Sequence, residues 1–309
     1  MMPARPTAWL NGLVGVVIFS GSLPATRLAL QGFDPLFLTY ARATIAAMAG
    51  AVALVLLKQT RPQRGEIPGL VLVAAGVVVG FPLLTALALE HITAARGLLY
   101  IALLPVMTAL FAVIRANERP RPPFWLFSLA ASLLVMAFAA STGRVAGTLP
   151  GDLMMLAAIV LCGLGYAEGG RLSRRLGGWQ VISWALLMTL PVMLPLALYA
   201  WPEDPTTVAP PAVLALFYVG LFSMLIGFIF WYRGLAQGGI ASVGQLQFLQ
   251  PFLGLALAAA ILGEPIGWIV CNDEPVGELL ARLATILVVS SVANAAHFLL
   301  VARACEQVS

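Results

Sequence analysis

The chain is poor in charged residues and nearly free of histidine and cysteine. Charged side chains make up 10% of its 309 residues, and it has two histidines and three cysteines. Soluble chains carry about 25% charged residues, so this chain could not cover a globular surface with them. Its cysteines, Cys162, Cys271 and Cys305, have no CxxC spacing, so they predict neither a metal cluster nor a disulfide framework.

Signature motifs of enzymes are missing as well. The sequence has no HExxH, no GxSxG and no phosphate-binding GxxxxGK[ST]. Two isolated histidines and the lack of clustered carboxylates leave little for metal or general acid/base chemistry. We therefore predict no enzyme activity, no metal and no cofactor. Without a nucleotide-binding motif, the energy for any movement of a solute would come from an ion or substrate gradient.

Long apolar runs are what the chain has instead. Apolar residues make up 61% of it, and its mean hydropathy is +0.97. A bilayer core about 30 Å thick needs ~20 apolar residues per helix, and a β-barrel would need ~10-residue alternating segments, which are absent. We predict an all-α polytopic membrane protein with ten transmembrane helices at 8–30, 36–57, 67–89, 93–114, 123–141, 152–170, 179–200, 211–232, 240–262 and 279–301.

Basic residues give the orientation of these helices, because cytoplasmic loops are enriched in arginine and lysine. If the N-terminus is cytoplasmic, the cytoplasmic segments hold Arg5, Lys58, Arg61, Arg64, Arg115, Arg119, Arg121, Arg171, Arg174, Arg175, Arg233 and Arg303. The net charge of +4 is thus a topology signal, and no nucleic-acid partner is predicted. We expect both termini in the cytoplasm.

An internal repeat is visible when Pro105 is aligned with Pro251, an offset of 146 residues. The offset also places Glu118 on Glu264, and the third and fourth predicted helices on the eighth and ninth. Each half then holds five helices, at 1–142 and 143–309. An odd number of helices per half places the second copy upside down, and such inverted repeats are typical of secondary transporters.

The segment HITAARGLLYIALLPVMTALFAVIRANERP and its second copy ending AAAILGEP resemble the EamA-type drug/metabolite transporters. DPLFLTYARATIAA at 34–47 is also similar to the second helix of that family. The resemblance covers residues 9–268. It implies a bacterial inner-membrane transporter that works by alternating access on amino acids, other small metabolites or drugs, often as an exporter.

The end of the chain departs from this pattern. IVCNDEPVGELLAR at 269–282 carries Asp273, Glu274, Glu278 and Arg282 where the offset places the tenth helix. A charge at the centre of a membrane helix is unfavourable by roughly 2.5 to 3.5 kcal/mol on insertion scales. The tenth helix therefore either begins near Leu279 or is disturbed.

Three polar side chains in the first half are candidate substrate ligands. Arg42 lies about one third into the second helix, where it could attract a carboxylate or could be a snorkelling or structurally paired arginine. Arg96 and Tyr100 are four residues apart on one face of the fourth helix. They suit a carboxylate-bearing or aromatic ligand, with an interface anchor as the alternative.

The ninth helix carries three glutamines, Gln245, Gln247 and Gln250, before Pro251. Amides are unfavourable in lipid, so these side chains should face protein or water. Gln247 and Gln250 can line one cavity while Gln245 points elsewhere, although hydrogen bonds between helices are the alternative. Pro251 and its repeat partner Pro105 each remove a backbone hydrogen bond, so both are predicted kink positions.

Aromatic residues and one carboxylate complete the candidates. Tyr166, Trp184, Tyr218 and Trp231 lie within or near helix ends, where aromatic belts at the membrane interface are common, but Tyr166 and Trp184 could stack on a ligand. Glu168 lies three residues before Arg171, which predicts an ion pair first and a proton-coupling site second. The sequence thus favours a secondary active or facilitative exporter. A membrane-embedded enzyme or a receptor-like binding module is the alternative.

Overall fold

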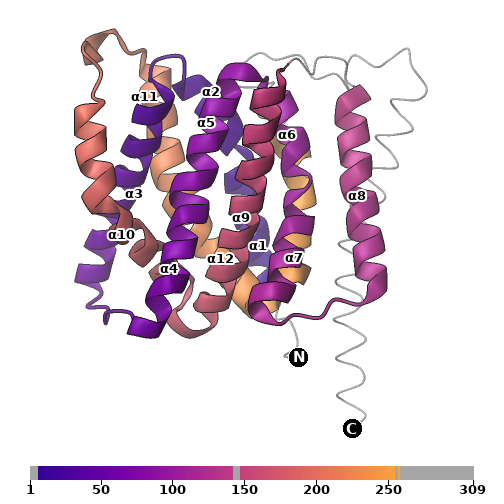
Figure 1. Cartoon of the computed structure of the whole chain (residues 1–309). Coiled ribbons are helices and arrows are strands. Elements are labelled where there is room, and N and C mark those ends of the chain that lie inside the picture. Colours follow the sequence, from indigo (N-terminus) through magenta and orange to yellow (C-terminus); the bar gives the residue numbers. More distant parts are fainter. Residues whose placement is uncertain (1–5, 142–146, 255–256, 258–309) are drawn as a thin grey trace.

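The computed structural model describes residues 6–141, 147–254 and 257, and this part of the chain is helical without a β-strand (Figure 1). Its α-helices are α1 Pro6–Ser20, α2 Ser22–Ala29, α3 Pro35–Leu56, α4 Ile67–Val73, α5 Phe81–His91, α6 Ala94–Ile101, α7 Leu104–Ala116, α8 Pro122–Ser141, α9 Leu149–Leu176, α10 Gly178–Tyr199, α11 Pro210–Phe217, α12 Gly227–Gly238 and α13 Ile240–Gly244. The described part also has two π-helical segments, η2 Ala74–Gly80 and η4 Tyr218–Ile226. It has three 3₁₀ segments, η1 Arg64–Glu66, η3 Pro205–Thr207 and η5 Gln245–Leu249.

Seven helical stretches in the described part are long and apolar enough to cross a membrane. They are Pro6–Ala29, Pro35–Leu56, Arg64–His91, Arg96–Ala116, Leu149–Leu176, Gly178–Tyr199 and Pro210–Gly238. Each corresponds to one predicted span, and α8 corresponds to the predicted span at 123–141. The predicted tenth helix and the end of the ninth lie outside the described residues, so the count of ten stays a prediction.

Two predicted helices are interrupted rather than continuous. The first breaks at Gly21, where an added Cβ would meet the hydroxyl of Tyr218. The fourth breaks between α6 and α7, where the N–H groups of Ala102 and Leu103 donate to carbonyls three residues earlier, at 3.1 and 2.9 Å. Pro105 follows directly, and the Ser132 hydroxyl on α8 donates to the Ala102 carbonyl at 2.9 Å. The irregular backbone is therefore satisfied by a neighbouring helix.

The irregular segments follow the register of the predicted repeat. The π segments η2 and η4 end at Gly80 and Ile226, and α6 and α13 begin at Ala94 and Ile240, both pairs 146 residues apart. The α6–α7 span ends just before Glu118, whereas α13 begins beside Glu118, whose carboxylate accepts its first two N–H groups. The two helices that the offset pairs thus begin at opposite ends of the bundle, and the inverted repeat itself stays a prediction.

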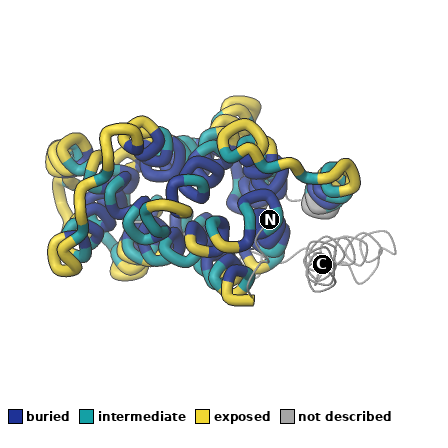
Figure 2. The backbone as a smooth tube through the Cα atoms, turned by 90° about the horizontal axis from the view of Figure 1, so that it is seen from below, coloured by how far each residue is buried: buried dark blue, intermediate teal, exposed yellow. Residues whose placement is uncertain are grey.

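Helix α9 packs against α4, η2, α5, α7, α10 and α12. Glycines allow the close approach, since a Cβ on Gly76 of η2 would lie 2.6 Å from the Leu161 carbonyl and 3.0 Å from the Gly165 Cα. Buried residues fill the centre of the bundle and exposed ones surround it (Figure 2). Large apolar side chains such as Val55 and Leu214, 74% and 70% exposed, lie on the outside, where lipid would cover them.

Candidate functional site

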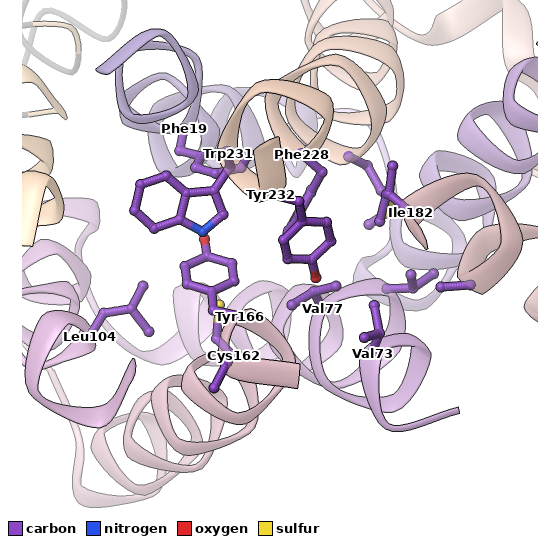
Figure 3. Packing of buried hydrophobic residues seen from close by; sticks show 14 of the residues in the cluster. Phe19, Val73, Val77, Leu104, Cys162, Tyr166, Ile182, Phe228, Trp231 and Tyr232 are labelled. Carbon is purple, nitrogen blue, oxygen red and sulfur yellow. The ribbon is translucent and has the colours of Figure 1, made fainter. Parts of the chain in front are cut away.

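A cluster of aromatic rings occupies the middle of the bundle. Phe19 of α1, Tyr166 of α9, and Phe228, Trp231 and Tyr232 of α12 are all at most 6% exposed. Figure 3 shows the Trp231 indole and the Tyr166 phenol pointing toward one another, with their ring centroids 5.4 Å apart. The Tyr232 hydroxyl donates to the Gly165 carbonyl at 3.1 Å. Helices from both predicted halves therefore meet at this aromatic cluster.

Two glutamines border the aromatic cluster. The Gln250 amide donates to the Phe19 carbonyl at 3.4 Å, and Gln247 accepts from the Thr108 hydroxyl of α7 at 3.5 Å. Gln245 instead donates to the Ala241 carbonyl of its own helix at 3.3 Å. All three are at most 3% exposed, so they face protein as the sequence predicts. Only Gln247 and Gln250 reach across to the other half.

Several buried polar atoms of the described residues have no hydrogen-bond partner. They include the indole Nε1 of Trp231, Nε2 of Gln247 and Oε1 of Gln250 and, on other helices, the hydroxyls of Thr44, Thr85 and Ser183. An unsatisfied buried polar atom is unfavourable by about 1–3 kcal/mol, and folded proteins keep few of them. Water or a polar ligand would satisfy the atoms of Trp231, Gln247 and Gln250, which are therefore the candidate contacts for a ligand.

Arg42 lies on the buried face of α3 and is 5% exposed. Its Nε is buried without a partner, and its guanidinium forms no hydrogen bond or ion pair within the described part of the chain. Arg42 is therefore largely covered by protein, and its role as a substrate ligand stays a prediction.

Arg96 and Tyr100, in contrast, lie beside a carboxylate that the sequence analysis did not single out. Arg96 donates to both oxygens of Asp152 on α9, at 2.8 and 2.6 Å. Asp152 is 15% exposed and Arg96 25% exposed, so the pair lies near the surface at one end of the bundle. The charge of Arg96 is already neutralised by Asp152.

Glu168 forms the ion pair that the sequence predicts and a second one that it does not. Its buried carboxylate accepts from Arg171 at 2.5 and 3.1 Å, and from Arg115 of α7 at 3.1 Å. Two guanidinium groups neutralise one carboxylate here, which makes this a strong tie between α7 and α9. Proton coupling through Glu168 stays a prediction.

The structure separates the aromatic candidates. Trp184 of α10 packs on the main core, partly buried, and has no ring contact with Tyr166. The interface-belt interpretation is wrong for Trp231 and Tyr166, which are 0% and 3% exposed. Sequence analysis missed Phe19, Phe228 and Thr108 as parts of the site. The sequence signal available for these three residues was their position well inside a predicted span. Many core residues share that position, so it does not single them out.

Within the described residues, no group of three or more histidine, cysteine, aspartate or glutamate side chains is placed to hold a metal ion. The interior instead combines aromatic rings, amides and one arginine without a partner. Those groups suit an organic molecule with an apolar body and polar ends.

Seven apolar helical stretches long enough to cross a membrane define a multi-pass membrane protein. Its sequence matches the model of the EamA-like transporter family at residues 7–140 and again at 149–302. The chain belongs to the EamA-like transporter family, as its sequence resemblance implied.

Relatives support the same assignment. The chain is 60% identical over 267 residues to "Uncharacterized transporter YdeK" of Bacillus subtilis, covering 86% of this chain and 93% of that protein. It is 29% identical over 251 residues to a "Probable terminal-alkyne amino-acid exporter" of Streptantibioticus cattleyicolor, covering 81% and 83% of the two chains. Membrane transport is thus the function of the family, and the Bacillus relative indicates a bacterial protein.

A solved structure shares the fold. One crystal structure of a protein superposes with a TM-score of 0.73 at 21% identity, over 94% of this chain and 99% of the other. A likeness at this level of identity concerns the fold alone.

Proposed function

We propose that this protein is a secondary active or facilitative transporter that exports small metabolites, such as amino acids or drugs, by alternating access. The proposal rests above all on one observation. Unpartnered polar atoms of Trp231, Gln247 and Gln250 are buried where helices of the two halves meet. A substrate bound there would contact both halves, so rocking of one half against the other would expose it to either side.

The name of the Streptantibioticus relative, an amino-acid exporter, supports the direction and the substrate class. In this proposal the halves are residues 1–142 and 143–309, related by inversion, and the protein lies in the bacterial inner membrane with both termini in the cytoplasm. Pro105 and Pro251 lie beside the irregular backbone where each half bends. A coupling proton, if one is used, has Glu168 as its candidate carrier.

The substrate contacts are proposed as follows. Trp231, Tyr166 and Phe19 stack on the apolar body, and the amides of Gln247 and Gln250 bond to its polar groups. Arg96 and Tyr100, near the end of the bundle that holds Asp152, and Trp184, six residues after the start of α10 at the other end, serve as contacts along the route through the bundle. Arg42 contributes the positive charge of the interior.

Metabolite profiling of the culture medium tests the proposal. Cells that overproduce the full chain should enrich a specific amino acid or related compound outside, compared with cells that do not.

Gln250→Ala should reduce this enrichment by about tenfold, since a lost amide contact to a bound ligand is worth on the order of 1 kcal/mol or more. Trp231→Phe should reduce it too, because this variant removes the indole N–H and keeps an aromatic ring. Arg96→Ala should have a smaller effect.

Gln245→Ala is the matched control, since this amide bonds only to its own helix. It should leave export near the wild-type value at equal membrane abundance. Equal export by wild type, Gln250→Ala and Trp231→Phe would contradict this placement of the site.

A further inference from the structure

Arg42 has an unusual position for a charged group in a membrane helix. It is the eighth residue of α3, about 10 Å from the start of the helix at 1.5 Å per residue. Leu38 and Ala46, one turn before and after it on the same face, are both 0% exposed. Leu38 belongs to the apolar cluster against α11, and Ala46 to the main core. Arg42 therefore lies at the seam of two apolar clusters.

Carboxylates elsewhere in the described part are already engaged where they are not exposed. Glu168 binds Arg115 and Arg171, Asp152 binds Arg96, Glu118 binds Arg174 and the start of α13, and Glu66 pairs with Arg175. Asp34 caps α3, accepting from the N–H groups of Leu36 and Phe37. The remaining acidic residues there, Glu90, Glu203 and Asp204, are exposed. The described residues thus supply a partner to every buried acid but none to Arg42.

An irregular element packs against α3 at this point. The π segment η4 lies along α3, and a Cβ on Gly220 would be 3.4 Å from the Arg42 carbonyl and 3.3 Å from Ile45. Segments of this type occur often at functional sites. The backbone of Arg42 therefore lies against an irregular element of the predicted second half.

A charge at this depth that finds no partner among residues 6–141, 147–254 and 257 is energetically unfavourable, and ionisable residues inside membrane spans are functional by default. We infer that Arg42 is the recognition point for a carboxylate carried by the transported metabolite. A guanidinium binds a carboxylate through two parallel charge-assisted hydrogen bonds, and no neutral group of equal size gives both. The inference rests on the proposed transport function, and it narrows the substrates to metabolites with a free carboxylate.

Matched substrates test the inference in the full chain reconstituted into liposomes. The vesicles are preloaded with L-leucine, L-phenylalanine and L-methionine together with their primary amides, and efflux is followed by mass spectrometry above the rate of protein-free vesicles. Wild-type protein should release the acids at least about tenfold faster than the amides, the loss expected for one charge-assisted bond. Arg42→Gln should remove this preference, and Arg42→Lys should keep part of it.

The outcomes separate the two claims. Equal efflux of acids and amides by the wild type would leave transport standing and overturn the role of Arg42. No efflux of any of them would overturn transport of amino acids and, with it, the carboxylate inference. The comparison uses the wild-type protein, so it holds even if a variant fails to fold.

A stability measurement adds a readout without transport. Arg42→Met replaces an unpaired charge by an apolar side chain of similar length, so its melting temperature in detergent should equal or exceed that of the wild type. Leucine at millimolar concentration should raise the wild-type melting temperature and leave that of Arg42→Met unchanged. A large drop in melting temperature for Arg42→Met would identify Arg42 as a structural residue with a carboxylate partner and overturn the inference.

Discussion

The two ends of the bundle are held together differently. We call the basic end the one that holds loops 57–66 and 117–121, and the opposite end the one that holds residues 30–34 and 200–209. Of the five ion pairs in the described part of the chain, four lie at the basic end and one, Arg96–Asp152, at the opposite end. Ion pairs between different helices are therefore concentrated at the basic end.

Hydrogen bonds outside these ion pairs are not confined to one end. The Gln180 amide donates to Gln59 at the basic end at 3.3 Å, the Ser22 and Ser223 hydroxyls lie 2.6 Å apart, and the Tyr218 hydroxyl donates to the Ile18 carbonyl at 2.7 Å. The Arg27 guanidinium donates to the Leu89 carbonyl towards the opposite end. Hydrogen bonds between charged groups contribute more than neutral ones. The basic end is therefore the end held more by charge, and the following variants test that difference.

The largest effect is expected for Glu168→Gln. This change leaves Arg115 and Arg171 without their shared buried counter-charge. Breaking a buried pair destabilises by ~3–5 kcal/mol, and the value here should lie at or below that range because both arginines are more than a third exposed. Thermal melting in detergent measures it, with exposed Glu203→Gln as the control. Equal melting of the two variants would contradict the importance of this tie.

Gly76→Ala should have the next largest effect. The new methyl group would meet the backbone of α9 at Leu161 and Gly165, so η2 and α9 must move apart. Overpacking of this type destabilises by about 1–3 kcal/mol. Gly65→Ala is the control, because nothing lies within 4 Å of a Cβ at Gly65. Size-exclusion chromatography compares the folded fractions of the two variants. The fraction should be lower for Gly76→Ala, and equal fractions would show that η2 and α9 can move apart without loss of stability.

Glu118→Ala should weaken the basic end by a smaller amount. The Glu118 carboxylate accepts from the N–H groups of Ile240 and Ala241 at 2.9 and 2.8 Å and binds Arg174, so it caps α13 from the other half. Loss of such a cap destabilises by about 1–2 kcal/mol. Amide hydrogen exchange should rise at the start of α13. Unchanged exchange there would show that the cap contributes nothing.

Asp152→Asn should have the smallest effect of the series. The Arg96–Asp152 pair is partly exposed, and such pairs contribute about 0–1 kcal/mol. Its melting temperature should therefore stay close to the wild-type value. A drop as large as that of Glu168→Gln would remove the difference between the two ends.

Much of the helical layout could be predicted from the sequence. The predicted second span, 36–57, agrees with Pro35–Leu56 to within one residue at each end. Asp34 and Pro35 mark the start of this helix in the sequence. The Glu168–Arg171 pair was predictable from its spacing on one helix. The offset that aligns Pro105 with Pro251 also aligns the ends of the π segments at Gly80 and Ile226.

Contacts between distant residues were not predictable. Asp152 is 56 residues from Arg96, and Glu118 is 122 residues from Ile240, so no local spacing indicates either contact. Trp231 is an aromatic residue in an apolar run, and composition alone does not say whether it faces lipid or the core. The break at Gly21 depends on the Tyr218 hydroxyl across the bundle. Tertiary packing decides all four features.

Vectorial movement of a metabolite tests the central claim most directly. Sealed liposomes containing the purified full chain would be loaded with an equimolar mixture of amino acids, and the outside solution followed over time without ATP. The account predicts that specific amino acids leave faster than from protein-free liposomes, unchanged in chemical form, and that Gln250→Ala slows them while Gln245→Ala does not. Amino acids that leave at the protein-free rate, or that are chemically altered without moving, would contradict it.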